Sequence, residues 1–267
     1  NTHMSQTESI RHLHNGIPIP LFGLDTINFK EKTYSTVLEA LHNGIRHIET
    51  ASDYGVEAAI GKAIQDSGIP RCDLFITDEI TGLNNTDATV RAAKASFRRL
   101  QLDYIDLLLM AWNGGDTETD PANDTVYKAW KGLEKLYKCG NAHAIGIVDF
   151  DPWQIEYLLQ NVEIAPMVSF VGLYPGHPDF DRLVTNKEHN ILTMAYLPGN
   201  IDTVINSREL KVLAEKHHCS TEEIILQYLK QKNCVITVRR TSLPKTELTL
   251  ADDEMQFLDV MNDYTAE

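Results

Sequence analysis

The run Tyr104-Ile105-Asp106-Leu107-Leu108-Leu109-Met110 is apolar at almost every position. A strand of a parallel sheet is covered on both faces, so it reads as a nearly continuous apolar run. Other short runs of this kind precede and follow it, at Leu21–Leu24, Arg46–Thr50, Leu74–Thr77, Ala144–Ile147, Met167–Val171, Ile191–Tyr196 and Val235–Val238. Together these runs predict eight parallel strands.

Segments with helical periodicity separate the apolar runs. They cover Thr33–Leu41, Glu57–Ile64, Thr86–Leu100, Pro121–Tyr137, a helix opened by Asp151-Pro152, and residues 178–189, 207–218, 221–232 and 251–263. Strands that alternate with helices predict an α/β protein, here a (β/α)₈ barrel. A doubly wound sheet is the alternative, but no G-x-G-x-x-G motif follows an early strand, which disfavours a dinucleotide fold of that type.

The N-terminal region precedes the first strand of the predicted barrel. Residues 12–19 hold an Asn15-Gly16 turn between apolar flanks, which predicts a β-hairpin. Residues 1–5 lack the features of a signal peptide and read as a tag remnant. An α/β barrel of about 250 residues is usually one domain, so we expect a single barrel domain over residues 6–267.

Composition narrows the range of partners. Lys and Arg number 24 against 38 Asp and Glu, for a net charge of −14, which disfavours nucleic acid. No apolar run approaches the length of a membrane span. The four cysteines are widely spaced without a CxxC pair, which argues against a zinc site or a disulfide scaffold and favours a reduced, cytoplasmic protein. We expect a small-molecule ligand.

Chemistry in such a barrel occurs at the carboxyl ends of the strands. The residues that the predicted strands place there are Asp25, Glu49, Tyr54, Glu79, Ala111, Trp112, Asp149, Phe170, Tyr196, Leu197 and Arg239.

Several motifs make the chain similar to a known family. They are Pro20-Leu21-Phe22-Gly23-Leu24, Gly44-Ile45-Arg46-His47-Ile48-Glu49-Thr50-Ala51 with Tyr54 and Gly61, Asp103-Tyr104-Ile105-Asp106-Leu107-Leu108-Leu109, Ala144-Ile145-Gly146, and Ala195-Tyr196 with Pro198. Over nearly its whole length the chain resembles the aldo-keto reductases. The resemblance implies a barrel whose bottom is plugged by the N-terminal hairpin. It also implies NADPH bound across the strand ends, reduction of aldehydes and ketones, and a monomer.

The resemblance breaks at the catalytic positions. The family's proton donor is matched by Tyr54, but its Asp, Lys and His partners are replaced by Glu49, Glu79 and Ala111. A neighbouring ammonium lowers the pKa of a phenol, whereas a carboxylate does the reverse. The catalytic tetrad is therefore largely replaced, as in an engineered or strongly diverged member.

The cofactor positions that the family implies also differ. A Gly, a Ser-Asn pair, a Gln and a Ser are replaced by Asp25, Val148-Asp149, Phe170 and Leu197, and the segment Thr241–Thr246 is shorter than in the family. Arg239 is the one candidate left for contact with a 2′-phosphate. We therefore expect that the chain binds no cofactor.

The leading hypothesis is cofactor-independent general-base catalysis, a lyase-type proton abstraction or elimination. Burial and a neighbouring Glu49 should raise the pKa of Glu79, the expected base, and Asp149 is the second candidate. Tyr54 would donate a hydrogen bond. Trp112, Phe170 and Tyr196 would hold a small, flat, aromatic substrate. Asp25, Ala111 and Leu197 would complete this pocket.

Other interpretations remain open at this stage. The chain could be a non-catalytic ligand-binding or inactive relative, or a residual NADPH-dependent carbonyl reductase that uses Tyr54 and Arg239. The carboxylate pair Glu49 and Glu79 could also serve a glycosidase, but rows of sugar-binding aromatic residues are missing. The carboxylates Asp25, Glu49, Glu79 and Asp149 could hold a hard cation, whereas the lack of a strand-end His disfavours zinc or iron. We expect no metal.

Overall fold

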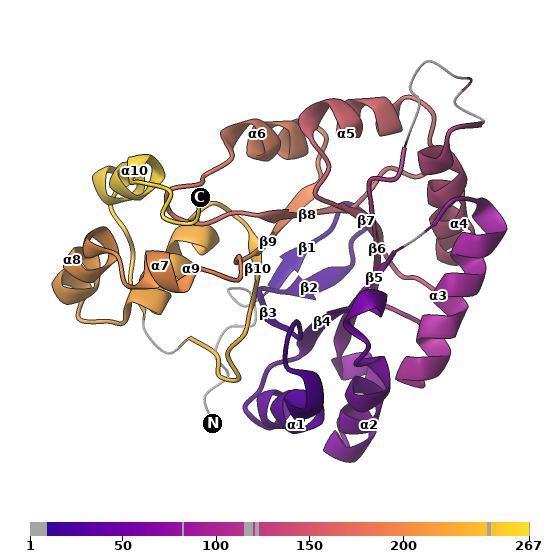
Figure 1. The fold of residues 1–267 in the computed structure, drawn as a ribbon, viewed down its shortest axis with the longest axis horizontal. Coiled ribbons are helices and arrows are strands. Elements are labelled where there is room, and N and C mark those ends of the chain that lie inside the picture. The colour runs from indigo at the N-terminus through magenta and orange to yellow at the C-terminus, as the bar shows by residue number, and fades with distance from the viewer. Residues whose placement is uncertain (1–9, 82, 115–119, 121–122, 245–246, 267) are drawn as a thin grey trace.

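The computed structural model describes residues 10–81, 83–114, 120, 123–244 and 247–266. Eight parallel strands form a closed barrel in the order β10-β3-β4-β5-β6-β7-β8-β9 (Figure 1). They are β3 Phe22–Asp25, β4 His47–Ala51, β5 Phe75–Ile80, β6 Leu107–Ala111, β7 Ile145–Val148, β8 Val168–Gly172, β9 Leu192–Tyr196 and β10 Val235–Val238. The predicted (β/α)₈ barrel is confirmed.

Helices surround the barrel, and their ends follow from capping side chains. They are α1 Thr33–His42, α2 Glu57–Ser67, α3 Thr86–Leu100, α4 Thr125–Lys138, α5 Pro152–Leu159, α6 Phe180–Glu188, α7 Asp202–Ile205, α8 Arg208–His217, α9 Thr221–Gln231 and α10 Asp252–Val260. Helix α4 begins later than predicted because Asp124 is its N-cap and accepts a hydrogen bond from the Val126 amide. The one-turn helix α7 was not predicted.

The N-terminal hairpin closes the amino-terminal end of the barrel. Strands β1 (Ile10–His12) and β2 (Pro18–Pro20) pair antiparallel, as predicted. The Asn15 amide donates to the His143 carbonyl at 3.1 Å, and His14 lies 3.3 Å from the Pro166 carbonyl. Both carbonyls precede a barrel strand, so the hairpin covers the end opposite to the strand termini that carry chemistry.

The connections at the carboxyl ends differ in length. Between β10 and α10 the described residues, 239–244 and 247–251, contain no helix. Most of residues 113–124, between β6 and α4, lie outside the described residues, as does the start of the helix predicted from Pro121. No helix in the described part of the chain is long and apolar enough to cross a membrane.

Helices α2 and α3 pack closely because Gly61 has no side chain. A Cβ atom at residue 61 would overlap the Leu100 carbonyl group. Backbone atoms cannot move aside as a flexible side chain can, so an added methyl group must push the two helices apart.

We expect Gly61→Ala to lower the free energy of unfolding by about 1–3 kcal/mol, as overpacking usually does. Urea denaturation followed by circular dichroism measures the change. Gly199→Ala is the matched control, because a Cβ atom at residue 199 would meet nothing within 4 Å. Equal stabilities of the two variants would contradict the packing interpretation.

Candidate functional site

Strand alternation brings the acidic residues to the interior of the barrel mouth. Asp25 lies opposite Glu49 on the neighbouring strand, and Glu49 lies opposite Thr77. Alternate residues of a strand point to the same face, so Glu79 shares the interior face of Thr77. In the same way the register places Ala111, Phe170 and Tyr196 on interior positions farther round the barrel.

Asp25 and Glu49 form a buried carboxyl pair. Asp25 is 5% exposed and Glu49 is fully buried, and apart from Asp25 no described residue shares a hydrogen bond with the Glu49 carboxyl. Burial, followed by the charges of Asp25 and Glu79, raises the pKa of Glu49 well above its usual value. Burial also raises the pKa of Asp25, but the Ile27 amide donates to it at 2.9 Å and Arg239 lies 3.7 Å away. Hence the proton of the pair belongs to Glu49.

Tyr54 lies beside this pair in a short 3₁₀ turn, Ser52–Tyr54, that follows β4. Its side chain is half-buried, and burial is the largest cause of a strongly raised pKa. The carboxyl groups of Glu49, Asp25 and Glu79 raise this pKa further, whereas Arg239 lowers it. The phenol of Tyr54 therefore keeps its proton at neutral pH.

Glu79 lies between the floor of the mouth and its rim. Burial raises its pKa to about 7, and the charges of Asp149 and Asp53 add to the shift. Among the described residues none donates a hydrogen bond to the Glu79 carboxyl or forms an ion pair with it. At neutral pH this carboxyl group is therefore divided between its neutral and charged forms.

Asp149 extends the acidic surface to the rim. Its φ of 54° lies in the left-handed region, which is uncommon for a residue other than glycine but tolerated by aspartate. The Tyr196 hydroxyl donates to the Asp149 carboxylate at 2.7 Å. The Tyr196 ring meets the Phe170 ring edge to face, with centroids 5.1 Å apart. The mouth thus joins an acidic side to an aromatic side.

Trp112 belongs to a different aromatic group from the one predicted. Its ring packs against Phe150, Trp153 and Tyr157, at centroid separations of 5.3, 5.3 and 5.8 Å. No ring contact among the described residues joins this group to Phe170 and Tyr196. Trp112 therefore fixes the start of α5 to the barrel rim, and Ala111 beside it is partly exposed.

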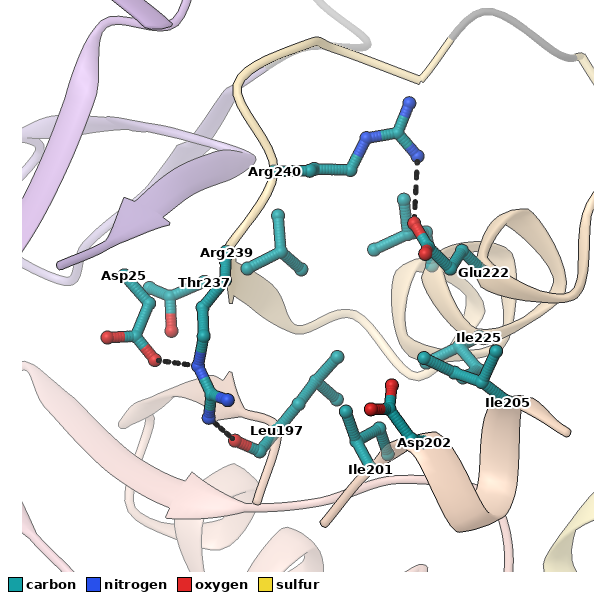
Figure 2. A pocket seen from close by; sticks show the side chains of 12 residues that line it. Asp25, Leu197, Ile201, Asp202, Ile205, Glu222, Ile225, Thr237, Arg239 and Arg240 are labelled. Carbon is teal, nitrogen blue, oxygen red and sulfur yellow. Dashed lines mark hydrogen bonds and ion pairs between the residues drawn. The ribbon is translucent and has the colours of Figure 1, made fainter. Parts of the chain in front are cut away.

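A cavity of about 250 Å³ lies beside the mouth (Figure 2). It is lined by Asp25, Leu197, Ile201, Asp202, Ile205, Glu222, Ile225, Leu226, Thr237, Val238, Arg239 and Arg240. The Arg239 guanidinium donates to the Leu197 carbonyl at 3.0 Å, and Arg240 lies 3.8 Å from Glu222. The sequence did not indicate the wall from α7 and α9, because Ile225 and Leu226 look like ordinary helix core and α7 is too short to show a helical period.

The comparisons with known proteins agree with this geometry. The model of the aldo/keto reductase family matches residues 21–204. The chain belongs to this family. A glyoxal reductase of Bacillus subtilis (strain 168) is 33% identical, with 94% of this chain and 91% of the relative aligned. A 9,11-endoperoxide prostaglandin H2 reductase of Trypanosoma cruzi (strain CL Brener) is 30% identical, over 94% of this chain and 90% of the relative.

Solved structures of aldo-keto reductases have the same fold. An aldo-keto reductase from a deep-sea metagenome library of the Medee basin is 28% identical, with a TM-score of 0.84 over 94% of this chain and 95% of its own. A Bombyx mori aldo-keto reductase, solved in complex with NADP, is 23% identical, with a TM-score of 0.85 over 96% and 93% of the two chains.

These findings overturn two expectations from the sequence. Cofactor-independent general-base catalysis by Glu79 is wrong, because two relatives of at least 30% identity, aligned over 94% of this chain, are named reductases. The expectation of no cofactor is wrong for a related reason, since structures of relatives contain NADP or NADPH. The acidic residues at the strand ends suggested that a polyanionic cofactor could not bind there. The raised pKa values of Glu49 and Glu79 reduce the negative charge at this end of the barrel.

The raised pKa of Glu79 predicts a pH-dependent change in stability. Between its usual value of 4.5 and about 7, the folded state holds more of this proton than the unfolded state. The contribution of Glu79 to stability therefore falls as pH rises through this interval. Glu79→Gln removes that loss.

We expect the unfolding free energy of Glu79→Gln, relative to that of the original chain, to increase as pH rises from about 5 to about 8. The gain should reach at most about 3 kcal/mol, since one pKa unit corresponds to about 1.4 kcal/mol. Urea denaturation at each pH measures it, with Glu215→Gln on α8 as the matched control. Parallel pH curves for Glu79→Gln and the original chain would contradict the assignment.

Proposed function

We propose that this member of the aldo/keto reductase family reduces carbonyl compounds with NADPH, using Tyr54 as the proton donor. The observation that carries the proposal is the location of Tyr54 directly after β4 at the barrel mouth, where the family resemblance implies the proton donor. Its raised pKa means that the hydroxyl has a proton to donate. The similarity to a glyoxal reductase over 94% of the chain supports the same reaction type.

The described residues fit the cofactor at two places. Arg239 and Arg240 bring two guanidinium groups to the cavity beside the mouth, and guanidinium groups bind phosphates well. Phe170 and Tyr196 form an aromatic surface on which a flat ring such as nicotinamide would pack. Each guanidinium already lies near a carboxylate, Asp25 or Glu222, so a phosphate must compete for it.

Bound NADPH would supply hydride to the carbonyl carbon of the substrate. The Tyr54 hydroxyl would donate its proton to the carbonyl oxygen as negative charge develops there. Burial protects that proton before reaction, but a charged Glu79 makes its release harder. A neutral Glu79 and a neutral Glu49 lower this cost, so the raised pKa values of both groups suit a weakly acidic phenol donor.

The same residues support the proposal that this is a strongly diverged member of the family. Glu49, Glu79 and Ala111 occupy positions where the family resemblance implies other side chains. The site then lacks the ammonium that would make Tyr54 a stronger acid. We infer a slower proton transfer than an ammonium-assisted donor would give, with substrate binding set by different contacts.

Tyr54→Phe tests the proton donor. We expect the rate of aldehyde-dependent NADPH oxidation to fall at least ~100-fold, because general acid catalysis contributes ~10²–10⁴. The dissociation constant for NADPH should stay within ~2-fold, since no cofactor contact is assigned to this hydroxyl. Absorbance of NADPH and fluorescence titration measure the two quantities, with Tyr104→Phe before β6 as control. Full activity of Tyr54→Phe would remove Tyr54 from the mechanism.

Arg239→Met tests the phosphate contact. We expect its dissociation constant for NADPH to rise ~10-fold, as loss of one charge-assisted hydrogen bond commonly does. Isothermal titration calorimetry measures binding, and Arg98→Met on α3 is the matched control. If the original chain fails to bind NADPH at millimolar concentration, the proposed function is wrong.

A further inference from the structure

The turn that carries Tyr54 has little support of its own. It is a single 3₁₀ turn, Ser52–Tyr54, and no side chain caps its start at Ala51. It ends at Gly55, whose φ of 68° lies in the left-handed region that glycine adopts readily, and a Cβ atom there would meet nothing within 4 Å. No described residue forms a hydrogen bond with the Tyr54 hydroxyl, so the position of this group depends on the backbone of the turn.

The neighbouring strand β5 offers a rigid attachment beside this turn. The pairing of β4 with β5 extends to Ala51 and Glu79, immediately before the turn. Strand β5 continues to Ile80, which is 1% exposed and pairs with Met110 on β6. Thr81 is the next residue, so it is joined directly to a strand that β6 holds in place.

Thr81 connects the turn to β5 through side-chain hydrogen bonds. Its hydroxyl donates to the Asp53 carboxylate, and its oxygen lies 3.3 Å from the Ser52 hydroxyl. A hydroxyl group has one proton to donate, so a Thr81 hydroxyl that donates to Asp53 must accept from Ser52. Both residues that precede Tyr54 in the turn are thus bonded to Thr81. Among the described residues, these are the side-chain hydrogen bonds that link the turn to another segment.

We propose that Thr81 is a positioning residue for Tyr54, because its hydroxyl binds Ser52 and Asp53 and thereby holds the turn that places Tyr54 at the barrel mouth. The consequence for catalysis rests on the proposed function, whereas the restraint on the turn follows from the hydrogen bonds alone. A proton donor must lie within hydrogen-bond reach of the reacting oxygen, and a displacement of about 1 Å can cost ~100-fold in rate. Thr81 therefore controls the rate without a contact with substrate.

Two substitutions of Thr81 separate the effect of its hydroxyl from that of its shape. Thr81→Val keeps the branched side chain and removes both hydrogen bonds, whereas Thr81→Ser keeps the hydroxyl. In Thr81→Val we expect kcat for NADPH-dependent aldehyde reduction to fall ~10-fold, while KM for the aldehyde and the dissociation constant for NADPH stay within ~2-fold. In Thr81→Ser, kcat should stay within ~2-fold of the value for the original chain, since the hydroxyl is retained.

Thr86→Val on α3 is the matched control. The half-buried Thr86 donates its hydroxyl to the Lys128 carbonyl at 2.8 Å, so this variant also removes a hydrogen bond between two segments. It should leave kcat within ~2-fold. A double-mutant cycle adds a second check, because Ser52→Ala and Thr81→Val both remove the bond between Ser52 and Thr81. The double variant should have the kcat of Thr81→Val within ~2-fold.

The position of Tyr54 is measured independently of turnover. A fluorotyrosine incorporated at residue 54 gives a ¹⁹F resonance, whose chemical shift and line width report the surroundings and the motion of the ring. We expect Thr81→Val to shift or broaden this resonance, because the turn loses its bonds to β5. Thr81→Ser and Thr86→Val should leave the resonance in place.

The outcomes separate the positioning role from the reductase function. A changed ¹⁹F resonance in Thr81→Val, for a chain that reduces no aldehyde, would support the positioning role and overturn the reductase function. Reduction of aldehydes with an unchanged kcat in Thr81→Val, or an unchanged resonance, would overturn the positioning role and leave the reductase function standing. An equal loss of kcat in Thr81→Ser or in Thr86→Val would also overturn the positioning role, because the loss would not depend on the Thr81 hydroxyl.

Discussion

Two carboxyl groups that cannot both be charged determine the character of this barrel mouth. Asp25 and Glu49 lie opposite each other on β3 and β4, and both are buried. Strand register fixes their proximity, so the repulsion cannot be relieved by moving either side chain into solvent. Protonation of Glu49 relieves it instead, while Arg239 and the Ile27 amide stabilise the charge on Asp25. Tyr54 and Glu79 then respond to the charge that remains.

The fold could be predicted from the sequence because its signals are strong and local. The continuous apolar run that ends in β6 and the Asn15-Gly16 turn both identify elements that the structure contains. Helix α7 was missed because four residues are too few to reveal a helical period. The start of α4 was placed too early because the side chain of Asp124, as N-cap, decides that boundary.

The site could be predicted in position but only partly in character. Strand alternation placed Asp25, Glu49 and Glu79 together, as the order of strands required. The sequence could not show that Trp112 packs against α5 while Tyr196 bonds to Asp149, because both depend on side-chain direction. The sequence led to the wrong reaction because it shows which residues are acidic but not their protonation states. In a buried cluster the protonation states determine the electrostatic potential.

Arg239 has a mechanical consequence as well as an electrostatic one. The first and last strands of the barrel, β3 and β10, meet without a covalent connection. From the end of β10, Arg239 reaches Asp25 on β3 and the Leu197 carbonyl just after β9. It therefore connects the ends of β3, β9 and β10 at the place where the barrel closes. Any ligand that draws this guanidinium away must break its contacts with Asp25 and the Leu197 carbonyl. Ligand binding in the neighbouring cavity and the rigidity of the β3–β10 pairing are therefore linked.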